Sequence, residues 1–211
     1  MIFFFGSAFY GKVGTYNDQW IESKFFHFMF IPLFPVSSIY VTRSDFRSRS
    51  GLDIGTNSKS IRAAYARLFT AAIAVITFYL GFLPDIFDTN FKLLMLTISV
   101  IAAVLWVYFC FFYGKAKKSE YAMRDKVGSI TGFYALPHMF DHAYLFTKFE
   151  DFEKKYRILY PGGNWKTDLM MDGGDPERYK IFYALALFNF MVHDEPENDT
   201  LYAKADALYE I

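Results

Sequence analysis

Two long stretches without a charged residue dominate the middle of the chain. They are residues 68–84, LFTAAIAVITFYLGFLP, and residues 93–114, LLMLTISVIAAVLWVYFCFFYG. As an α-helix the second stretch would be roughly 33 Å long, which matches a hydrocarbon core about 30 Å thick. The first reaches a similar length when it is extended back to Ala63. We therefore predict two transmembrane helices, 63–83 and 93–114, joined by a loop over 84–92.

The charges around these stretches give the predicted hairpin an orientation. Basic residues precede the first stretch and follow the second: Arg43, Arg47, Arg49, Lys59, Arg62 and Arg67, then Lys115, Lys117, Lys118, Arg124 and Lys126. The connecting loop has only Lys92 beside two aspartates. Because cytoplasmic loops carry an excess of Lys and Arg, both termini are predicted to face the cytoplasm. Four residues are expected to anchor the hairpin at the membrane surfaces: Arg67, Tyr79, Tyr113 and Lys115.

The predicted spans hold few polar groups, and no Asp, Glu, Lys, Arg or His lies deep within them. An ion path or proton relay normally needs such a group, and a haem needs an axial ligand. Transport by the hairpin alone and haem binding inside the membrane are therefore not expected. Small residues could pack the two helices together or bind another subunit: Ala71, Ala72, Ala74, Gly81, Ala102 and Ala103.

The first 43 residues have a different pattern, in which short aromatic and β-branched runs alternate with turns. The runs IFFFG, FYGKVG, QWIES, KFFHFMFIPLFP and SIYVT are separated by Gly, Asn-Asp and Pro-Val-Ser-Ser. Such runs are typical of strands, so residues 1–43 are predicted to form a small antiparallel β unit. Residues 44–62 contain many Ser, Gly and Asn and are expected to link this unit to the first span.

One of these runs, residues 24–35, has no polar face. It is too short and too rich in proline to span a membrane as a helix. As a strand it would carry bulky apolar side chains on both faces, and the first sixty or so residues of the chain can cover only one of them. We therefore expect Phe25, Met29 or Phe34 to contact either the membrane boundary or another chain. His27 is expected to pack within the strand.

Helical signals return after the second span, and residues 115–211 are predicted to form a C-terminal helical domain. Residues 137–159 have apolar side chains near helical spacing. A second helix is expected after Asp175, a favourable N-cap that is followed by Pro176, and a third after Asp199. Together with the β unit, these elements indicate an α+β membrane protein.

Composition and charge agree with this class. Aromatic residues make up 21% and hydrophobic residues 54% of the 211 positions, which is high for an ordinary soluble domain. The net charge of zero argues against a general nucleic-acid binder, which needs a surplus of basic residues. Residues 119–211 carry ten basic and sixteen acidic residues, so the predicted helical domain is acidic. The single cysteine, Cys110, excludes an intramolecular disulfide and a cysteine-based metal site.

A metal site is the main candidate for chemistry. His138, Asp141 and His142 form the pattern H-x-x-D-H, and two histidines four positions apart share one face of a helix. A third ligand, Asp175 or Glu197, would have to come from elsewhere. The alternative is that these residues simply begin a helix.

Other motifs give less support for a binding or catalytic site. The stretch DGGDPE, 172–177, lacks the alternating oxygen ligands of a calcium loop, so helix capping explains it better. The sequence has no phosphate-binding glycine loop and no recognisable Ser-His-Asp or Cys-His arrangement. No cofactor is therefore predicted, and catalysis has no positive support.

Residues 25–41, FFHFMFIPLFPVSSIYV, resemble the F-F-x-I-P-L-F-P segment of small bacterial membrane proteins in which an N-terminal zinc-ribbon-like unit precedes transmembrane helices. The paired cysteines that bind zinc in those ribbons are absent from this sequence. The resemblance implies a metal-free β unit at the cytoplasmic face of a bacterial inner membrane, and it implies no catalytic residue.

The favoured hypothesis is a non-enzymatic accessory or scaffold subunit of a larger membrane protein complex. Its expected partners are membrane lipids and other membrane-protein subunits, and no nucleic acid. Two alternatives stay open. One is a metal-dependent membrane enzyme or sensor that uses His138 and His142, and the other is a lipid-binding module built on the N-terminal unit.

Overall fold

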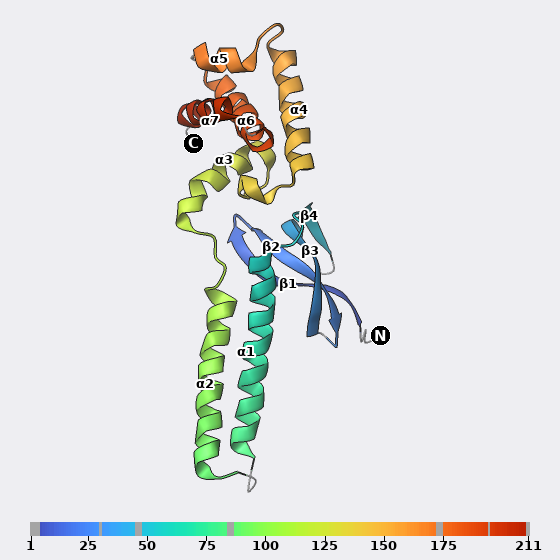
Figure 1. Cartoon of the computed structure of the whole chain (residues 1–211), viewed down its shortest axis with the longest axis vertical. Coiled ribbons are helices and arrows are strands. Elements are labelled where there is room, and N and C mark those ends of the chain that lie inside the picture. Colours follow the sequence, from blue (N-terminus) through green and yellow to red (C-terminus); the bar gives the residue numbers. More distant parts are fainter. Residues whose placement is uncertain are drawn as a thin grey trace. The chain divides into compact units, whose positions relative to one another are not determined.

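The structure is a computed structural model of the whole chain. It describes residues 5–29, 31–44, 48–83, 87–171, 175–193 and 195–209, and Figure 1 shows the course of the chain. The contacts divide the chain into two compact units, Met1–Lys118 and Ser119–Ile211, named here the N-terminal unit and the C-terminal unit. The predicted C-terminal domain, 115–211, begins four residues before the second unit.

The N-terminal unit begins with an antiparallel sheet, which has four strands in the described residues, in the order β1-β2-β3-β4. The strands are β1 (Phe5–Tyr16), β2 (Gln19–Phe28), β3 (Ile31–Ser44) and β4 (Arg49–Asp53). Asn17 and Asp18 join β1 to β2, and both have the positive φ that a two-residue hairpin turn requires, 46° and 58°. The predicted α+β class and the small antiparallel β unit are confirmed.

The predicted linker, residues 44–62, is wrong in two places. Strand β4 lies within it and pairs with β3, and the first long helix already begins at Ser58. The glycine of β4, Gly51, lies very close to its neighbour, since a Cβ there would be 1.9 Å from the carbonyl oxygen of Tyr40. The Ser- and Gly-rich composition therefore belongs to an edge strand that approaches the next strand closely.

Two antiparallel helices follow, α1 (Ser58–Phe82) and α2 (Thr89–Phe111). Both are long and apolar enough to cross a membrane, and only 11% of the most apolar stretch of each is buried within the protein. Helix α1 starts five residues before the predicted Ala63, and α2 ends three residues before the predicted Gly114. The two apolar helices are thus longer at one end and shorter at the other than the sequence predicts.

The two helices pack against each other through small side chains. The hydroxyl of Ser99 donates to the carbonyl of Ala74 over 2.8 Å. A Cβ at Gly81 would lie 2.8 Å from the side chain of Leu96, and Ala102 is buried. At these positions the small residues therefore serve the packing of the hairpin itself.

The described part of the C-terminal unit is built from helices. These are α3 (Tyr121–Thr131), α4 (His142–Leu159), α5 (Trp165–Met171), α6 (Pro176–Val192) and α7 (Pro196–Leu208), with short 3₁₀ turns at Lys118–Glu120 and Pro137–Met139. Helix α6 forms its centre, because every residue from Ile181 to Asn189 is buried. A helix that is apolar all round is suited to this position.

The three predicted helices correspond to α4, α6 and α7, while α3 and α5 are additions. Helix α4 begins at His142 and not at residue 137, because Asp141 has an extended backbone and its carboxylate accepts from the N–H of Tyr144 over 2.6 Å. Helix α7 begins at Pro196, where the fixed φ of proline suits the first turn.

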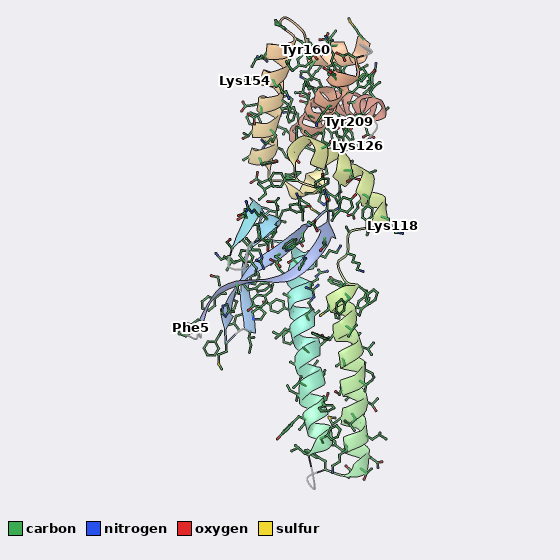
Figure 2. The ribbon with its side chains drawn as sticks, turned by 180° about the vertical axis from the view of Figure 1, so that it is seen from behind. Phe5, Lys118, Lys126, Lys154, Tyr160 and Tyr209 are labelled. Carbon is green, nitrogen blue, oxygen red and sulfur yellow. The ribbon has the colours of Figure 1, made fainter. Side chains whose placement is uncertain are left out.

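Two polar contacts join α3 to the end of the chain. The ammonium of Lys126 lies 2.6 Å from the carboxylate of Asp206, and the hydroxyls of Ser129 and Tyr209 are 2.8 Å apart. Lys126 and Tyr209 are labelled in Figure 2, which shows the side chains of the same structure. These contacts make α3 part of the C-terminal unit.

Candidate membrane interface

Three buried serines join the sheet to the start of α1. The hydroxyl of Ser60 donates to the carbonyl of Gly11 over 2.7 Å and accepts from the hydroxyl of Ser23 over 2.9 Å. The hydroxyls of Ser23 and Ser38 are 2.6 Å apart. These residues, Ser23, Ser38 and Ser60, have no exposed surface and are named the serine cluster. Because unpaired buried hydroxyls would be costly, the bonds hold α1 against the first three strands.

The same contact explains where α1 begins. Asn57 is its N-cap, since the side-chain oxygen accepts from the N–H of Ser60 over 2.9 Å. The backbone N–H of Asn57 donates to the hydroxyl of Ser38 over 2.9 Å. On β1, Gly11 has a φ of 75°, and a Cβ there would lie 2.0 Å from the carbonyl oxygen of Ser60. A glycine is required at this position for both reasons.

The end of α2 is bonded to the same strand. The N–H of Gly14 donates to the carbonyl of Gly114 over 2.6 Å. The guanidinium of Arg67 donates to the carbonyl of Phe109 over 2.8 Å and to that of Lys12 over 2.9 Å. Arg67 thus joins α1, α2 and β1, a role that the sequence does not predict. Its contact with lipid headgroups stays a prediction.

One face of the aromatic strand β2 is covered by α1. Phe25 is fully buried, and its ring packs edge-on against those of Tyr65 and Tyr10, with centroids 5.5 Å and 5.8 Å away. The hydroxyl of Tyr65 donates to the carbonyl of Leu33 on β3 over 2.7 Å. The assignment of Phe25 to an exposed interface is therefore wrong, because a helix of the same chain occupies that face.

Apolar side chains are bare at the end of the sheet where β2 finishes and β3 begins. Eight apolar side chains there are between 39% and 66% exposed, and they are named the apolar tip: Phe5, Phe26, Phe28, Met29, Ile31, Leu33, Phe34 and Val36. The strand register brings them together, because Phe5 lies opposite Phe28 and Phe26 lies opposite Phe34. The rings of Phe5, labelled in Figure 2, and Phe28 are stacked with centroids 6.1 Å apart.

Met29 and Phe34, which the sequence assigns to an interface, both belong to the apolar tip. Their exposed fractions are 52% and 66%. Their contact with a membrane or another chain stays a prediction, but they are bare within this chain as that prediction requires.

The remaining predicted anchors lie at opposite ends of the hairpin. Tyr79 is exposed near the end of α1. Tyr113 lies just after α2, with its ring 5.3 Å from that of Phe109, and the ammonium of Lys115 lies 5.3 Å from the ring centroid of Phe112. Such amphipathic side chains are typical of membrane surfaces, and their anchoring role stays a prediction.

The two histidines predicted as metal ligands do not share a helix face. His138 lies in the 3₁₀ turn before α4, His142 is the first residue of α4, and Asp141 is extended between them. Both histidines are exposed. Of the expected third ligands, Asp175 caps α6 and Glu197 lies in the first turn of α7. The described residues contain no group of three His, Cys, Asp or Glu that could hold a metal.

The C-terminal unit has an open cavity of about 380 Å³, lined by Glu153, Tyr156, Arg157, Gly163, Asn164, Trp165 and Lys166. The hydroxyl of Tyr156 donates to the carboxylate of Asp168. Burial, together with this bond, raises the pKa of Tyr156. This hydroxyl therefore stays protonated and acts as a structural donor beside the cavity.

Comparisons with protein-family models, with curated proteins and with solved structures find no match to this chain. The resemblance of residues 25–41 to small bacterial membrane proteins stays a prediction. The candidate interface is therefore argued from the geometry of this chain.

The sequence does not reveal the serine cluster or the role of Tyr65. Ser23, Ser38 and Ser60 are far apart in the chain, and no local pattern marks a serine as buried. One signal is present at the start of α1, since an asparagine before an apolar run is typical of an N-cap. Asn57 would have placed the helix start at Ser58.

Proposed function

We propose that this protein is an accessory or scaffold subunit of a larger membrane protein complex. Helices α1 and α2 span the membrane as a hairpin, and the N-terminal sheet and the C-terminal unit lie on the cytoplasmic side. The observation that carries the proposal is the bare surface of the hairpin, since only 11% of the most apolar stretch of each helix is buried. Core helices of soluble proteins are covered by their neighbours, whereas an apolar surface of this length suits lipid.

Charge supports the orientation. Lys59 and Arg62 lie near the start of α1, and Lys115 and Lys117 follow α2, whereas the other end of the hairpin has Lys92 beside acidic residues. An excess of basic residues favours the cytoplasmic side. The resemblance of residues 25–41 favours a bacterial inner membrane.

The junction between sheet and hairpin supports the scaffold role. The serine cluster and Arg67 bond the sheet directly to both apolar helices. A sheet that is joined in this way keeps a fixed height above the membrane. The C-terminal unit adds a second folded body with its own core around α6. Such an arrangement suits the presentation of binding surfaces to other subunits.

The proposal is tested on the full-length protein in its native membrane. We expect the protein to stay in the membrane after alkaline carbonate extraction. In mild detergent it should elute with a protein mass above that of one chain, together with a second polypeptide in constant ratio or a defined number of copies. A stable lone monomer would contradict the subunit role, and release by carbonate would contradict the anchor.

Orientation is tested with single cysteines in a Cys110→Ser background. Ser50→Cys on β4 and Asp199→Cys on α7 should react with a membrane-impermeant maleimide only after the cells are permeabilised. Asn90→Cys, at the start of α2, should react in intact cells. All three positions are exposed, so the opposite labelling pattern would show that the orientation is reversed.

A further inference from the structure

The proposed function gives no role to the apolar tip. Between Lys24 and Arg43 the sequence has no Asp, Glu, Lys or Arg. His27, the histidine in this stretch, is 8% exposed. A bare patch with several aromatic side chains and no charge marks an interaction site.

Two hydrogen bonds fix the direction in which β3 runs along α1. At the start of the helix, Asn57 donates to Ser38 over 2.9 Å, and about two turns later Tyr65 donates to the carbonyl of Leu33 over 2.7 Å. Strand and helix therefore run in opposite directions. Residues that precede Leu33 lie beyond Tyr65, toward the connection between α1 and α2. Figure 1 shows the start of β1, the end of β2 and the start of β3 extending beside α1 in this direction.

The sheet changes from basic to apolar at the same level as the helix does. Lys24 lies opposite Ser37, next to the serine that contacts the N-cap of α1, and Lys59 and Arg62 lie in the first turns of α1. Arg67 is the next charged residue of α1, and its guanidinium is bonded to the carbonyls of Lys12 and Phe109. Beyond Arg67 both surfaces are apolar. A bilayer imposes this order of headgroup and acyl chain on every surface that enters it. A soluble protein partner would give no reason for the two levels to agree.

We infer that the apolar tip enters the cytoplasmic leaflet beside the hairpin, where lipid acyl chains cover Phe5, Phe26 and Phe34. Lys24 then lies among the headgroups. This inference rests on the proposed membrane span, because α1 is what holds the tip at this depth. It adds a second, monotopic attachment to the bilayer, made by a sheet and not by a helix.

The strand backbone limits the depth of insertion. Strand β4 does not pair with residues 31–37 of β3, so this part of β3 is an open sheet edge. Open sheet edges are not found in the hydrocarbon region of a bilayer. Pro32 and Pro35 have no N–H to satisfy, and the carbonyl of Leu33 is bonded to Tyr65. The backbone therefore stays among the headgroups, and the side chains enter the acyl boundary by about 5–10 Å.

Spin-label accessibility on the full-length protein tests this inference. In a Cys110→Ser background, nitroxides are placed by Phe34→Cys at the tip, Val75→Cys in α1 and Ser50→Cys on β4. The protein is reconstituted in vesicles of equal parts phosphatidylcholine and phosphatidylglycerol. Collisions with oxygen, which concentrates among acyl chains, are compared with collisions with a water-soluble nickel chelate. We expect an oxygen-to-nickel ratio at Phe34 several-fold above that at Ser50 and approaching that at Val75.

Two further positions on β3 exclude an artefact of the label. Because β3 descends along α1, the ratio should rise in the order Val36→Cys, Phe34→Cys, Ile31→Cys. A flat profile across these three positions would overturn the inference, since a label that draws itself into lipid has no reason to follow the strand.

The remaining outcomes separate the two proposals. A water-like value at Phe34 with a lipid-like value at Val75 would overturn the inference and leave the hairpin anchor intact. Water-like values at all positions would remove the anchor itself. A label at Phe34 could also collide rarely with both reagents, while its spectrum is broadened by the label of a neighbouring chain. This result would place a second copy of the chain on the tip and overturn lipid contact.

Discussion

Helices α6 and α2 are both rich in apolar residues, but the protein covers one and leaves the other bare. In α6 the nine residues Ile181–Asn189 are all buried. In α2, all of whose residues are described, the buried residues are Ser99 and Ala102. Composition alone does not distinguish a core helix from a lipid-facing helix. The difference lies in what surrounds each helix, and the surroundings of α2 are outside the chain.

The sheet repeats this contrast on a smaller scale. Its buried groups include both the hydroxyls of the serine cluster and apolar side chains such as Ile21, Phe25 and Tyr40, whereas the eight apolar side chains of the tip are exposed. So many exposed apolar side chains in one place are unusual for a sheet in water. They are expected where the medium at the tip is lipid.

The largest expected effect comes from removing one ring in each kind of helix. Phe182→Ala in α6, where the ring is 1% exposed, should lower the free energy of unfolding of the C-terminal unit by about 3–5 kcal/mol. Phe78→Ala in α1, where the ring is 55% exposed, should cost less than about 1 kcal/mol because most of the ring lies outside the packed protein. Amide hydrogen exchange of the full-length protein in detergent measures the loss of stability in each variant. Equal losses would show that the two helices do not differ in how the protein covers them.

A charge placed on the bare surface of α2 tests its surroundings directly. Val100 is 64% exposed near the middle of the helix. Val100→Lys should cost about 3 kcal/mol on insertion into the membrane and reduce the fraction that resists carbonate extraction. Val100→Leu serves as the control and should insert normally. Full tolerance of the lysine would mean that this surface faces water.

Removing the central hydroxyl of the serine cluster tests the junction. Ser60→Ala deprives Gly11 of a donor and Ser23 of an acceptor, both in a buried site. We expect a loss of about 1–3 kcal/mol, seen as faster hydrogen exchange of the β1 amides. Ser50→Ala changes an exposed strand residue and should have no such effect. If both variants exchanged alike, the cluster would not be what fixes the sheet to α1.

The smallest effect concerns the pH dependence of the C-terminal unit. Burial raises the pKa of Tyr144 from its usual value of 10 to about 12. Between these values the unfolded chain releases the proton and the folded chain keeps it, so stability is full below pH 10 and falls as the pH rises toward about 12. Tyr144→Phe should make this fall shallower.

At neutral pH, Tyr144→Phe should leave stability unchanged or slightly higher, because the buried hydroxyl has no hydrogen-bond partner among the described residues. Urea unfolding at a series of pH values measures both effects. An unchanged slope in the alkaline range would show that Tyr144 titrates normally in the folded protein.

The sequence by itself determined the elements that depend on local pattern. Two long uncharged stretches sufficed for α1 and α2. Aromatic runs between turn residues sufficed for an antiparallel β unit but not for its strands, because KFFHFMFIPLFP, taken as one strand, contains the end of β2 and the start of β3. Asp175 with Pro176 marked the start of α6, since capping chemistry acts within one turn of the chain. The exposed Met29 and Phe34 could also be singled out, because a strand without a polar face needs cover on both sides.

Only the tertiary structure decided which surfaces remain bare. Phe25 is covered because Tyr65, forty residues later, lies over it, and Arg67 bonds to carbonyls that precede and follow it by more than forty residues. The H-x-x-D-H pattern loses its helical geometry because Asp141 caps a helix that begins after it. Burial and long-range hydrogen bonds depend on pairs of distant residues, and no local spacing encodes them.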